Sequence, residues 1–380
     1  MSDLTAEPSA AMRSILKRIA TGPELSKDIS REEARQGMRF VLDGAVDPVQ
    51  AGVFLIALRM KRETDDENRG ILEALLEATQ RVTAPVDDVV DLADPYDGFT
   101  RTMPASPFLS AVLAACGVPA VSHGVESMGP KYGVTHRQVL AAAGVPVDLA
   151  PLQAAQRLGD PGIGWAYLDQ KAFCPKLHDL AKLRTLIVKR PAITTCEALL
   201  GPIRGRLSTH LVTGFVHKPY PRIYALLARH AGFDSALIVR GVEGGVIPSL
   251  RQAGKAFTYH DKGPEQPIEF SPQELGIEEA VLAPPIPGRP QREGDPADQS
   301  ASDLDAVAVA RAAAQAGLAA LAGDPGPTRD SLVCGAALCL WHLKRHDSLQ
   351  SAAAAVRGVL DSGQALQRIR RARIGNSRES

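Results

Sequence analysis

A glycine-rich loop at residues 122–134, SHGVESMGPKYGV, contains the residue types that most directly suggest chemistry. Its glycines can bring backbone N–H groups close to an anion, and Lys131 adds a positive charge. Glu126, however, places an acid where a phosphate cradle favours a neutral or basic residue. Three interpretations follow from the residues alone: a working phosphate site, a site converted to another ligand, or a tight turn.

His123 in this loop is the candidate general base, since imidazole titrates near neutral pH. A histidine that precedes a glycine turn also commonly packs or hydrogen-bonds within its own loop. Glu243, alone on a glycine turn, is typical of a solvated loop residue.

Hydrophobic spacing predicts which elements position these residues. Residues 1–86 read as helices, with Ser30 and Glu33 as a capping box, Pro48 in a first turn and Thr64 as an N-cap. From residue 87 onward, short apolar strands alternate with helices, which predicts a sheet with helical crossovers. Open α/β sheets bind ligands at the carboxyl ends of their strands, so the site is expected among those loops.

The expected fold class is therefore α/β. A small N-terminal helical domain, 1–86, is hinged to a larger α/β domain, 87–380, with a central mixed sheet, surrounding helices and a Pro-rich insertion at 283–301.

Composition excludes several functional classes. The 43 basic and 43 acidic side chains balance, so no global field draws the chain to nucleic acid or an anionic membrane. Five cysteines without a C-x-x-C pair argue against a disulfide framework or a zinc site, and they favour a cytoplasmic location. We expect no membrane span, because no run of 18 apolar residues occurs.

Residues 25–64 closely resemble the N-terminal helical domain of the anthranilate phosphoribosyltransferase family, and residues 359–371 resemble its closing helix. The resemblance implies a two-lobed homodimer formed through the helical domain. It also implies that residues of about 165–195 return to that domain. Phosphoribosyl pyrophosphate and Mg²⁺ would bind in the cleft between the lobes.

Of the four elements that position phosphoribosyl pyrophosphate and its metal in the family, three are altered in this chain. The diphosphate-binding G-T-G-G-D turn reads Asp94-Pro95-Tyr96-Asp97-Gly98, in which Pro95 lacks an N–H and two acids would face a polyanion. Each such repulsion costs about 4 kcal/mol at 4 Å and an effective dielectric near 20. The N-I-S-T element keeps one hydroxyl, Ser106, which could equally begin a helix without any ligand.

The family's K-H-G-N-R loop becomes Ser122 to Glu126, and its Mg²⁺-binding Asp-Glu pair becomes Val246 and Ile247. Hydrocarbon side chains cannot bind a hard cation, so Mg²⁺ is doubtful, and we expect no metal site and no cofactor.

One family feature persists: in the segment 178–195, the resemblance implies that Arg184 binds a ligand carboxylate and that Arg190 matches a second arginine of the family. Arginine suits carboxylate or phosphate because its guanidinium group donates two parallel hydrogen bonds, and the alternative is a salt bridge between lobes.

The resemblance and the residue types together give the candidate ligand-binding residues Tyr96, Gly98, Ser106, His123, Gly124, Lys131, Gly133, Arg184, Arg190, Arg240 and Glu243.

The altered elements resemble those of the divergent YbiB-type branch of the family, and the HGVESM stretch is similar to that of its cyanobacterial anthranilate-phosphoribosyltransferase-like members. Two functions are compatible with this pattern. One is a transferase of the same fold acting on a different phosphorylated or ribosylated ligand and inefficient on anthranilate. The other is a non-catalytic dimer that binds single-stranded nucleic acid through local basic clusters. These clusters are Lys182, Arg184, Lys189 and Arg190, then Arg204 and Arg206, and the arginines near the C-terminus.

Overall fold

The N-terminal part of the molecule is a bundle of four helices. The computed structural model describes residues 7–22, 24–289 and 304–374. The helices are α1 (Pro8–Ile19), α2 (Arg31–Leu42), α3 (Pro48–Lys61) and α4 (Asp65–Glu77). The predicted caps are confirmed: Ser30 and Glu33 form a capping box on α2, and Thr64 and Glu67 form another on α4.

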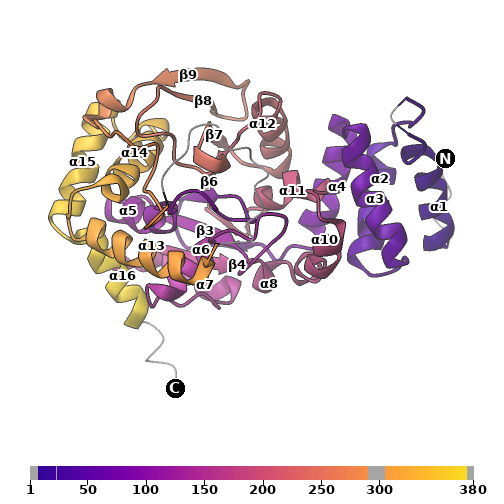
Figure 1. The fold of residues 1–380 in the computed structure, drawn as a ribbon, viewed down its shortest axis with the longest axis horizontal. Coiled ribbons are helices and arrows are strands. Elements are labelled where there is room, and N and C mark those ends of the chain that lie inside the picture. Colours follow the sequence, from indigo (N-terminus) through magenta and orange to yellow (C-terminus); the bar gives the residue numbers. More distant parts are fainter. Residues whose placement is uncertain (1–6, 23, 290–303, 375–380) are drawn as a thin grey trace.

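A seven-stranded sheet forms the centre of the larger lobe (Figure 1). Its strands are β2 (Asp88–Ala93), β3 (Ala120–Gly124), β4 (Trp165–Asp169), β6 (Ser208–Gly214), β7 (Ser235–Val239), β8 (Gly254–Tyr259) and β9 (Gln266–Phe270). The order is β4-β3-β2-β6-β7-β8-β9; the first five are parallel, and β8 and β9 run antiparallel to their neighbours. The sheet is therefore mixed, as predicted.

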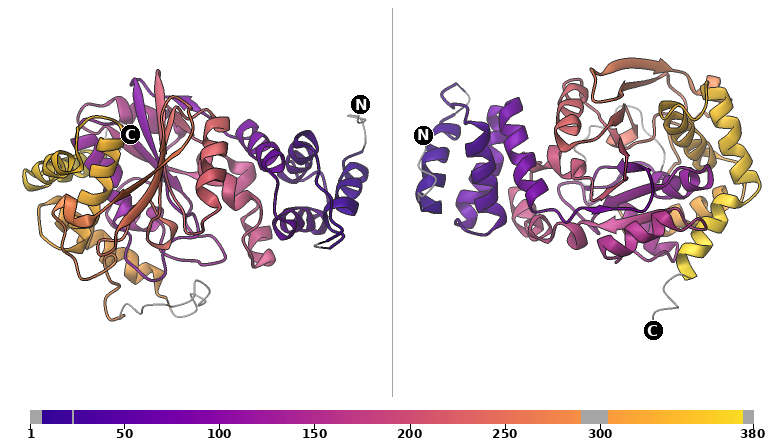
Figure 2. Two further views of the ribbon diagram at one scale, coloured as in Figure 1. Left: turned by 90° about the horizontal axis from the view of Figure 1, so that it is seen from above. Right: turned by 180° about the vertical axis from the view of Figure 1, so that it is seen from behind.

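Helices cover both faces of the sheet (Figure 2). Those that follow the first strands are α5 (Leu109–Ala115), α6 (His136–Ala142), α7 (Pro151–Gly159) and α12 (Tyr220–Ala231). The C-terminal helices are α13 (Ala306–Leu321), α14 (Pro327–His342), α15 (Leu349–Asp361) and α16 (Gln364–Ile374). Short 3-10 helices are η1 (Ser106–Phe108), η2 (Glu197–Leu199), η3 (Val242–Gly244) and η4 (Pro272–Leu275).

Alternating strand residues divide the interior into two cores. Val90 and Leu92 of β2 pack in the core under α5 and the C-terminal helices, whereas Val89 and Ala93 pack in the core that continues into the helical bundle. Successive side chains of a strand point to opposite faces, so a buried central strand is apolar throughout. Asp91 is the exception in β2, and it lies fully buried.

Two sets of elements lie between the helical bundle and the main sheet. The strands β1 (Val82–Thr83) and β5 (Ile203–Arg204) pair in parallel beside the main sheet. Short helices lie between β4 and β5: α8 (Gln170–Phe173), α9 (Pro175–His178), α10 (Ala181–Ile187) and α11 (Ile193–Cys196). Within residues 165–195, which we predicted to return to the helical domain, the first five belong to the sheet, while α10 contacts α3 and α11 contacts α4.

The predicted insertion at 283–301 lies only in part within the described residues, since 290–303 fall outside them, as do residues 375–380 at the basic end. Across the ranges that the structure covers, every helix is too short or too polar to cross a membrane.

Candidate functional site

The loops that hold most of the candidate residues meet at one edge of the sheet. The strand order reverses between β2 and β6, because β3 and β4 extend the sheet on one side of β2, and β6 and β7 extend it on the other. A crevice at the carboxyl ends of strands forms at such a switch point in open α/β sheets. The loops after β2, β3, β6 and β7 leave from this edge.

Gly98 and Gly133 allow the loops after β2 and β3 to touch backbone to backbone. A Cβ atom on Gly98 would lie 2.6 Å from the carbonyl carbon of Gly133, and one on Gly133 would lie 2.6 Å from the backbone nitrogen of Phe99. Gly98 also has a φ of +75°, in the left-handed region that favours glycine. Phe99 and Val134 pair across the contact. Both glycines therefore have a structural requirement, whether or not a ligand binds.

Asp94 is buried at the end of β2, and three partners surround its carboxylate. Oδ2 accepts hydrogen bonds from Ser106 Oγ and from His136 Nε2 at 2.6 Å, and Oδ1 accepts one from the backbone N–H of Val246 at 2.7 Å. Burial raises the pKa of Asp94, but the nearby His136 and these hydrogen bonds outweigh burial and lower it overall. The Ser106 hydroxyl, a predicted ligand contact, is thus bound inside the chain.

Tyr96, His123 and Asp91 form a buried hydrogen-bonded chain. Tyr96 Oη lies 2.5 Å from His123 Nδ1, and His123 Nε2 lies 2.8 Å from Asp91 Oδ1. Burial raises the pKa of Tyr96 well above its ordinary value, so the phenol keeps its proton and donates a hydrogen bond to Nδ1. Nε2 then carries the imidazole proton and donates to Asp91. Both ring nitrogens of the candidate base are engaged within the chain, and its side chain is fully buried.

Asp97 connects the two lobes through ion pairs. Its Oδ2 accepts hydrogen bonds from Arg190 Nη2 at 2.6 Å and from Nε at 3.0 Å, and Lys131 Nζ lies 3.6 Å from Oδ1. Lys131 also donates to the backbone oxygens of Gly98 and Glu243. Lys131 and Arg190, both predicted to bind a ligand, therefore share the carboxylate of Asp97. The expected repulsion between this acid and an anionic ligand is thus offset by two cations.

The position of Glu243 on a glycine turn suggested a solvated loop residue, but its side chain is buried. Its side chain is 1% exposed, and its carboxylate accepts hydrogen bonds from the segment 100–102 after β2. The prediction failed because the partners lie more than 140 residues away in the chain.

The other predicted residues are separated from this cluster or exposed. Arg184 forms a buried two-point ion pair with Glu197, with nitrogen–oxygen distances of 2.6 and 2.7 Å. Arg240 is exposed directly after β7, and Gly124 ends β3 near the hydroxyl of Tyr167. The structure thus brings together the loops bearing Tyr96, Gly98, Lys131, Gly133, Arg190 and Glu243, whereas Arg184 points into the interior.

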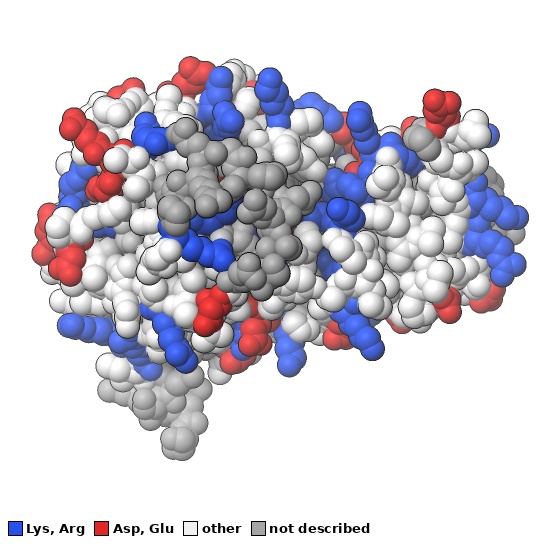
Figure 3. All heavy atoms as spheres, viewed as in Figure 1, with Lys and Arg blue, Asp and Glu red and all other residues white. Residues whose placement is uncertain are grey.

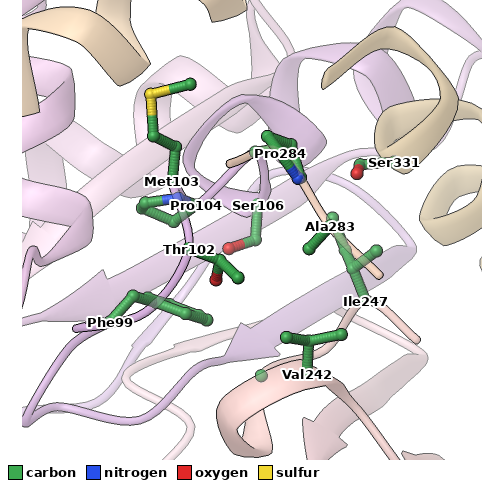
Figure 4. A pocket seen from close by; sticks show the side chains of 12 residues that line it. Phe99, Thr102, Met103, Pro104, Ser106, Val242, Ile247, Ala283, Pro284 and Ser331 are labelled. Carbon is green, nitrogen blue, oxygen red and sulfur yellow. The ribbon is translucent and has the colours of Figure 1, made fainter. Parts of the chain in front are cut away.

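A small pocket opens beside this cluster, where the family's Mg²⁺-binding elements would lie (Figure 4). Thr102 and Ser106 bring hydroxyls to it, and the side chains of Phe99, Val242 and Ile247 bring only hydrocarbon. Val246 is buried and offers no oxygen. Because Asp94 and Glu243 are already hydrogen-bonded within the chain, the donors present do not fit Mg²⁺. Among the described residues, no three His, Cys, Asp or Glu side chains are grouped to hold a metal ion.

Lys and Arg side chains gather where the two lobes meet on the face shown in Figure 3. Figure 3 shows fewer acidic side chains at this junction than around the rim of the larger lobe. The loop after β6 contributes exposed His217 and Lys218 to the same edge of the sheet as Arg240.

Sequence reasoning missed several members of the site: His136, Asp91, Thr100, Thr102 and Glu197. His136 directly follows the N-cap Thr135, and no local pattern marks it as a partner of Asp94. Asp91 carried the one available signal, a charged residue in the middle of an otherwise apolar strand. A buried carboxylate in a strand requires a partner, and that partner is His123.

Comparison with known proteins places both lobes in one family. Residues 13–79 match the helical bundle domain of a glycosyl transferase family, and residues 97–366 match the a/b domain of a glycosyl transferase family. The anthranilate phosphoribosyltransferase of Nitrobacter hamburgensis is 28% identical over 361 residues, covering 94% of this chain and 97% of that protein.

Solved structures show the same fold. Anthranilate phosphoribosyltransferase from Thermus thermophilus has a TM-score of 0.70 at 21% identity, covering 96% of this chain and 98% of that one. The Saccharomyces cerevisiae enzyme in complex with PRPP and Mg has a TM-score of 0.73 at 16% identity, again covering 96% and 98%.

Proposed function

This chain belongs to the glycosyl transferase family built from a helical bundle domain and an a/b domain, and from that premise we propose that it binds a phosphorylated or ribosylated small molecule in the cleft between its lobes. The ligand differs from the pair of substrates that the resemblance implies. A transfer reaction catalysed by this chain would not use Mg²⁺. Anthranilate would be a poor substrate for it.

Cationic side chains from several segments, gathered at the carboxyl edge of the sheet, carry the proposal. Arg190 and Lys131 come from different segments and share the single carboxylate of Asp97. Arg240 after β7 and Lys218 after β6 add two exposed cations at the same edge. Guanidinium and ammonium groups gathered at a switch point favour an anionic ligand.

The loss of the diphosphate-binding and Mg²⁺-binding elements supports the proposal that the ligand is not phosphoribosyl pyrophosphate. Val246 and Ile247 supply no oxygen, and Asp94 and Ser106 are bound to each other. Reactions of phosphoribosyl pyrophosphate depend on positioning and charge stabilisation at the diphosphate. A chain without these contacts is expected to turn anthranilate over poorly.

The test uses the full-length protein. With anthranilate, phosphoribosyl pyrophosphate and Mg²⁺, we expect no loss of anthranilate fluorescence above the rate without protein. With ribose 5-phosphate alone, we expect a rise in melting temperature, because a ligand that binds only the folded state stabilises it. Lys131→Ala combined with Arg190→Ala should abolish the rise, and Lys262→Ala, exposed at the opposite end of the sheet, should preserve it. Clear turnover of anthranilate by the wild type would refute the proposal.

The apolar outer stripe of α3 supports a homodimer formed through the helical domain. Val49, Val53, Ile56 and Met60 recur at helical spacing, and Val49 and Met60 are each 73% exposed. The opposite face of α3 is buried in the bundle, so the helix is apolar on two opposite faces, with Gln50, Arg59 and Lys61 between them. Such helices are normally covered, and a second copy of this chain, placed symmetrically, would cover the stripe.

Nucleic-acid binding by such a dimer has less support from the contacts. The basic clusters that suggested it are largely engaged: Arg184 is buried with Glu197, Arg204 donates to the backbone of Gly232, and Arg206 pairs with Asp87. A salt-dependent gel shift with single-stranded DNA would favour this function, and no shift at low salt would exclude it.

A further inference from the structure

The segment Thr100–Thr102 forms a cradle for an anion. Glu243 Oε2 accepts from the Thr100 backbone N–H at 2.9 Å and from its hydroxyl at 3.2 Å. Oε1 accepts from the backbone N–H groups of Arg101 at 3.0 Å and Thr102 at 2.9 Å, and from the Thr102 hydroxyl at 2.9 Å. Successive N–H groups that converge in this way form an anion-binding concavity, and here the anion belongs to the chain itself.

Glu243 occupies this cradle from an unfavourable backbone conformation. Its φ is +54°, a left-handed value that side chains with a Cβ adopt rarely. The residue lies in η3 on the loop between β7 and β8, followed by Gly244 and Gly245. Because its carboxylate is 1% exposed and receives five hydrogen bonds, the side-chain contacts offset the backbone strain.

The cradle is next to the cations of the proposed cleft. Lys131 Nζ donates to the backbone oxygen of Glu243 at 3.3 Å and lies 3.6 Å from Asp97, which binds Arg190. Thr102 lines the small pocket of Figure 4. Two neighbouring anion positions therefore exist at this edge: the cradle, filled by Glu243, and the Lys131–Arg190 position, shared with Asp97.

We propose that Glu243 is a specificity-determining residue: its carboxylate fills the Thr100–Thr102 cradle, so the cleft accepts a ligand with one phosphate or carboxylate group and excludes a diphosphate. The inference rests on the proposed function, because it describes the ligand of the same cleft. A second phosphoryl group would have to displace Glu243 and would meet its negative charge. The single remaining group is bound by Lys131 and Arg190.

The variant Glu243→Gly tests this inference, because glycine removes the carboxylate and tolerates the left-handed backbone. Binding of inorganic phosphate, pyrophosphate and ribose 5-phosphate to the full-length chain is measured by calorimetry at fixed ionic strength. We expect the wild type to bind pyrophosphate no more tightly than phosphate. The variant should bind pyrophosphate at least about tenfold more tightly than the wild type does. Glu274→Ala, which removes an exposed glutamate of η4, should behave as the wild type.

A second variant, Glu243→Gln, guards against misfolding of the first, since it keeps the side-chain volume and removes the charge. A pyrophosphate-dependent rise in its melting temperature beyond that of the wild type would also support the inference. Equal pyrophosphate affinity of wild type and folded Glu243→Gly would overturn it. If instead the wild type binds neither phosphate nor ribose 5-phosphate, the proposed function fails, and that result is independent of the pyrophosphate comparison.

Discussion

Arg184 and Glu197 form an ion pair from which water is excluded, with both side chains no more than 3% exposed. Desolvation of two charges is costly, and the two-point contact offsets that cost only while both partners are present. Gln170 Nε2 adds a weak hydrogen bond to Glu197 at 3.4 Å. Arg184, which we predicted to bind a ligand carboxylate, therefore binds a carboxylate of the chain itself. This ion pair connects α10 to η2.

Removing one partner of this pair should be far more damaging than removing both. Arg184→Met leaves a buried carboxylate unpaired, and we expect the free energy of unfolding to fall by about 3–5 kcal/mol. The double variant Arg184→Met with Glu197→Met should recover most of that loss. Urea unfolding of both variants and the wild type measures the difference. A single variant as stable as the wild type would show that the pair is open in solution.

At the scale of elements, a histidine network attaches α14 to three strands. His342 Nε2 lies 2.9 Å from Ser235 Oγ in β7, and Nδ1 lies 2.7 Å from Thr258 Oγ1 in β8. His210 of β6 also contacts Ser235 Oγ at 2.8 Å, and His260 stacks on His342 with ring centroids 4.5 Å apart. Burial, followed by the nearby His260, His210 and Lys344, lowers the pKa of His342 well below its ordinary value.

Acidification should weaken this attachment. The folded pKa of His342 lies below the unfolded value of about 6.5, so its contribution to stability is complete above that pH and is lost as the pH falls. His210 and His260 have lowered pKa values and act in the same direction. We expect the free energy of unfolding to decrease by roughly 1 kcal/mol or more from pH 7.5 to 5.5, because a tenfold change in a protonation equilibrium corresponds to about 1.4 kcal/mol. His342→Gln should flatten the profile, and His217→Gln, exposed after β6, should not. Parallel profiles for wild type and His342→Gln would contradict this assignment.

At the scale of the whole molecule, α4 packs against α12 and α11 where the lobes meet, whereas the outer face of α3 is left apolar. Arg190 reaches Asp97 from the segment after α10, so this ion pair adds a polar contact to that boundary. The stripe on α3 lies on the other side of the bundle from its buried face. The proposed dimer and the proposed ligand would thus use different surfaces.

Charges placed on that stripe should separate the dimer without unfolding the chain. Val49→Glu combined with Met60→Glu is expected to halve the mass measured by light scattering, because the interface would bury charges without partners. Leu152→Glu on α7, which replaces a side chain that is 58% exposed, should leave the mass unchanged. A single-chain mass for the wild type would contradict the proposed dimer.

The features that the sequence determined by itself depend on residues close in the chain. The capping boxes at Ser30 and Thr64 join positions three residues apart, and helical spacing identified α1 to α4. The alternation of strands and helices established the fold class. Sequence reasoning did not identify β4, β8 and β9. The edge strand β9 exposes most of its side chains and lacks an apolar run, whereas β4 is buried throughout and its short apolar run was overlooked.

Only the tertiary structure decided what the charged residues do. His136 lies 42 residues from Asp94, Glu243 lies 143 residues from Thr100, and Arg190 lies 93 residues from Asp97. The first two pairs depend on the strand order that brings the loops after β2, β3 and β7 to one edge, and the third depends on the segment after α10 lying against that edge. A buried charge needs a partner, but no local pattern shows whether that partner is a ligand or the chain itself. For Asp94, Asp97 and Glu243, the structure shows partners within the chain.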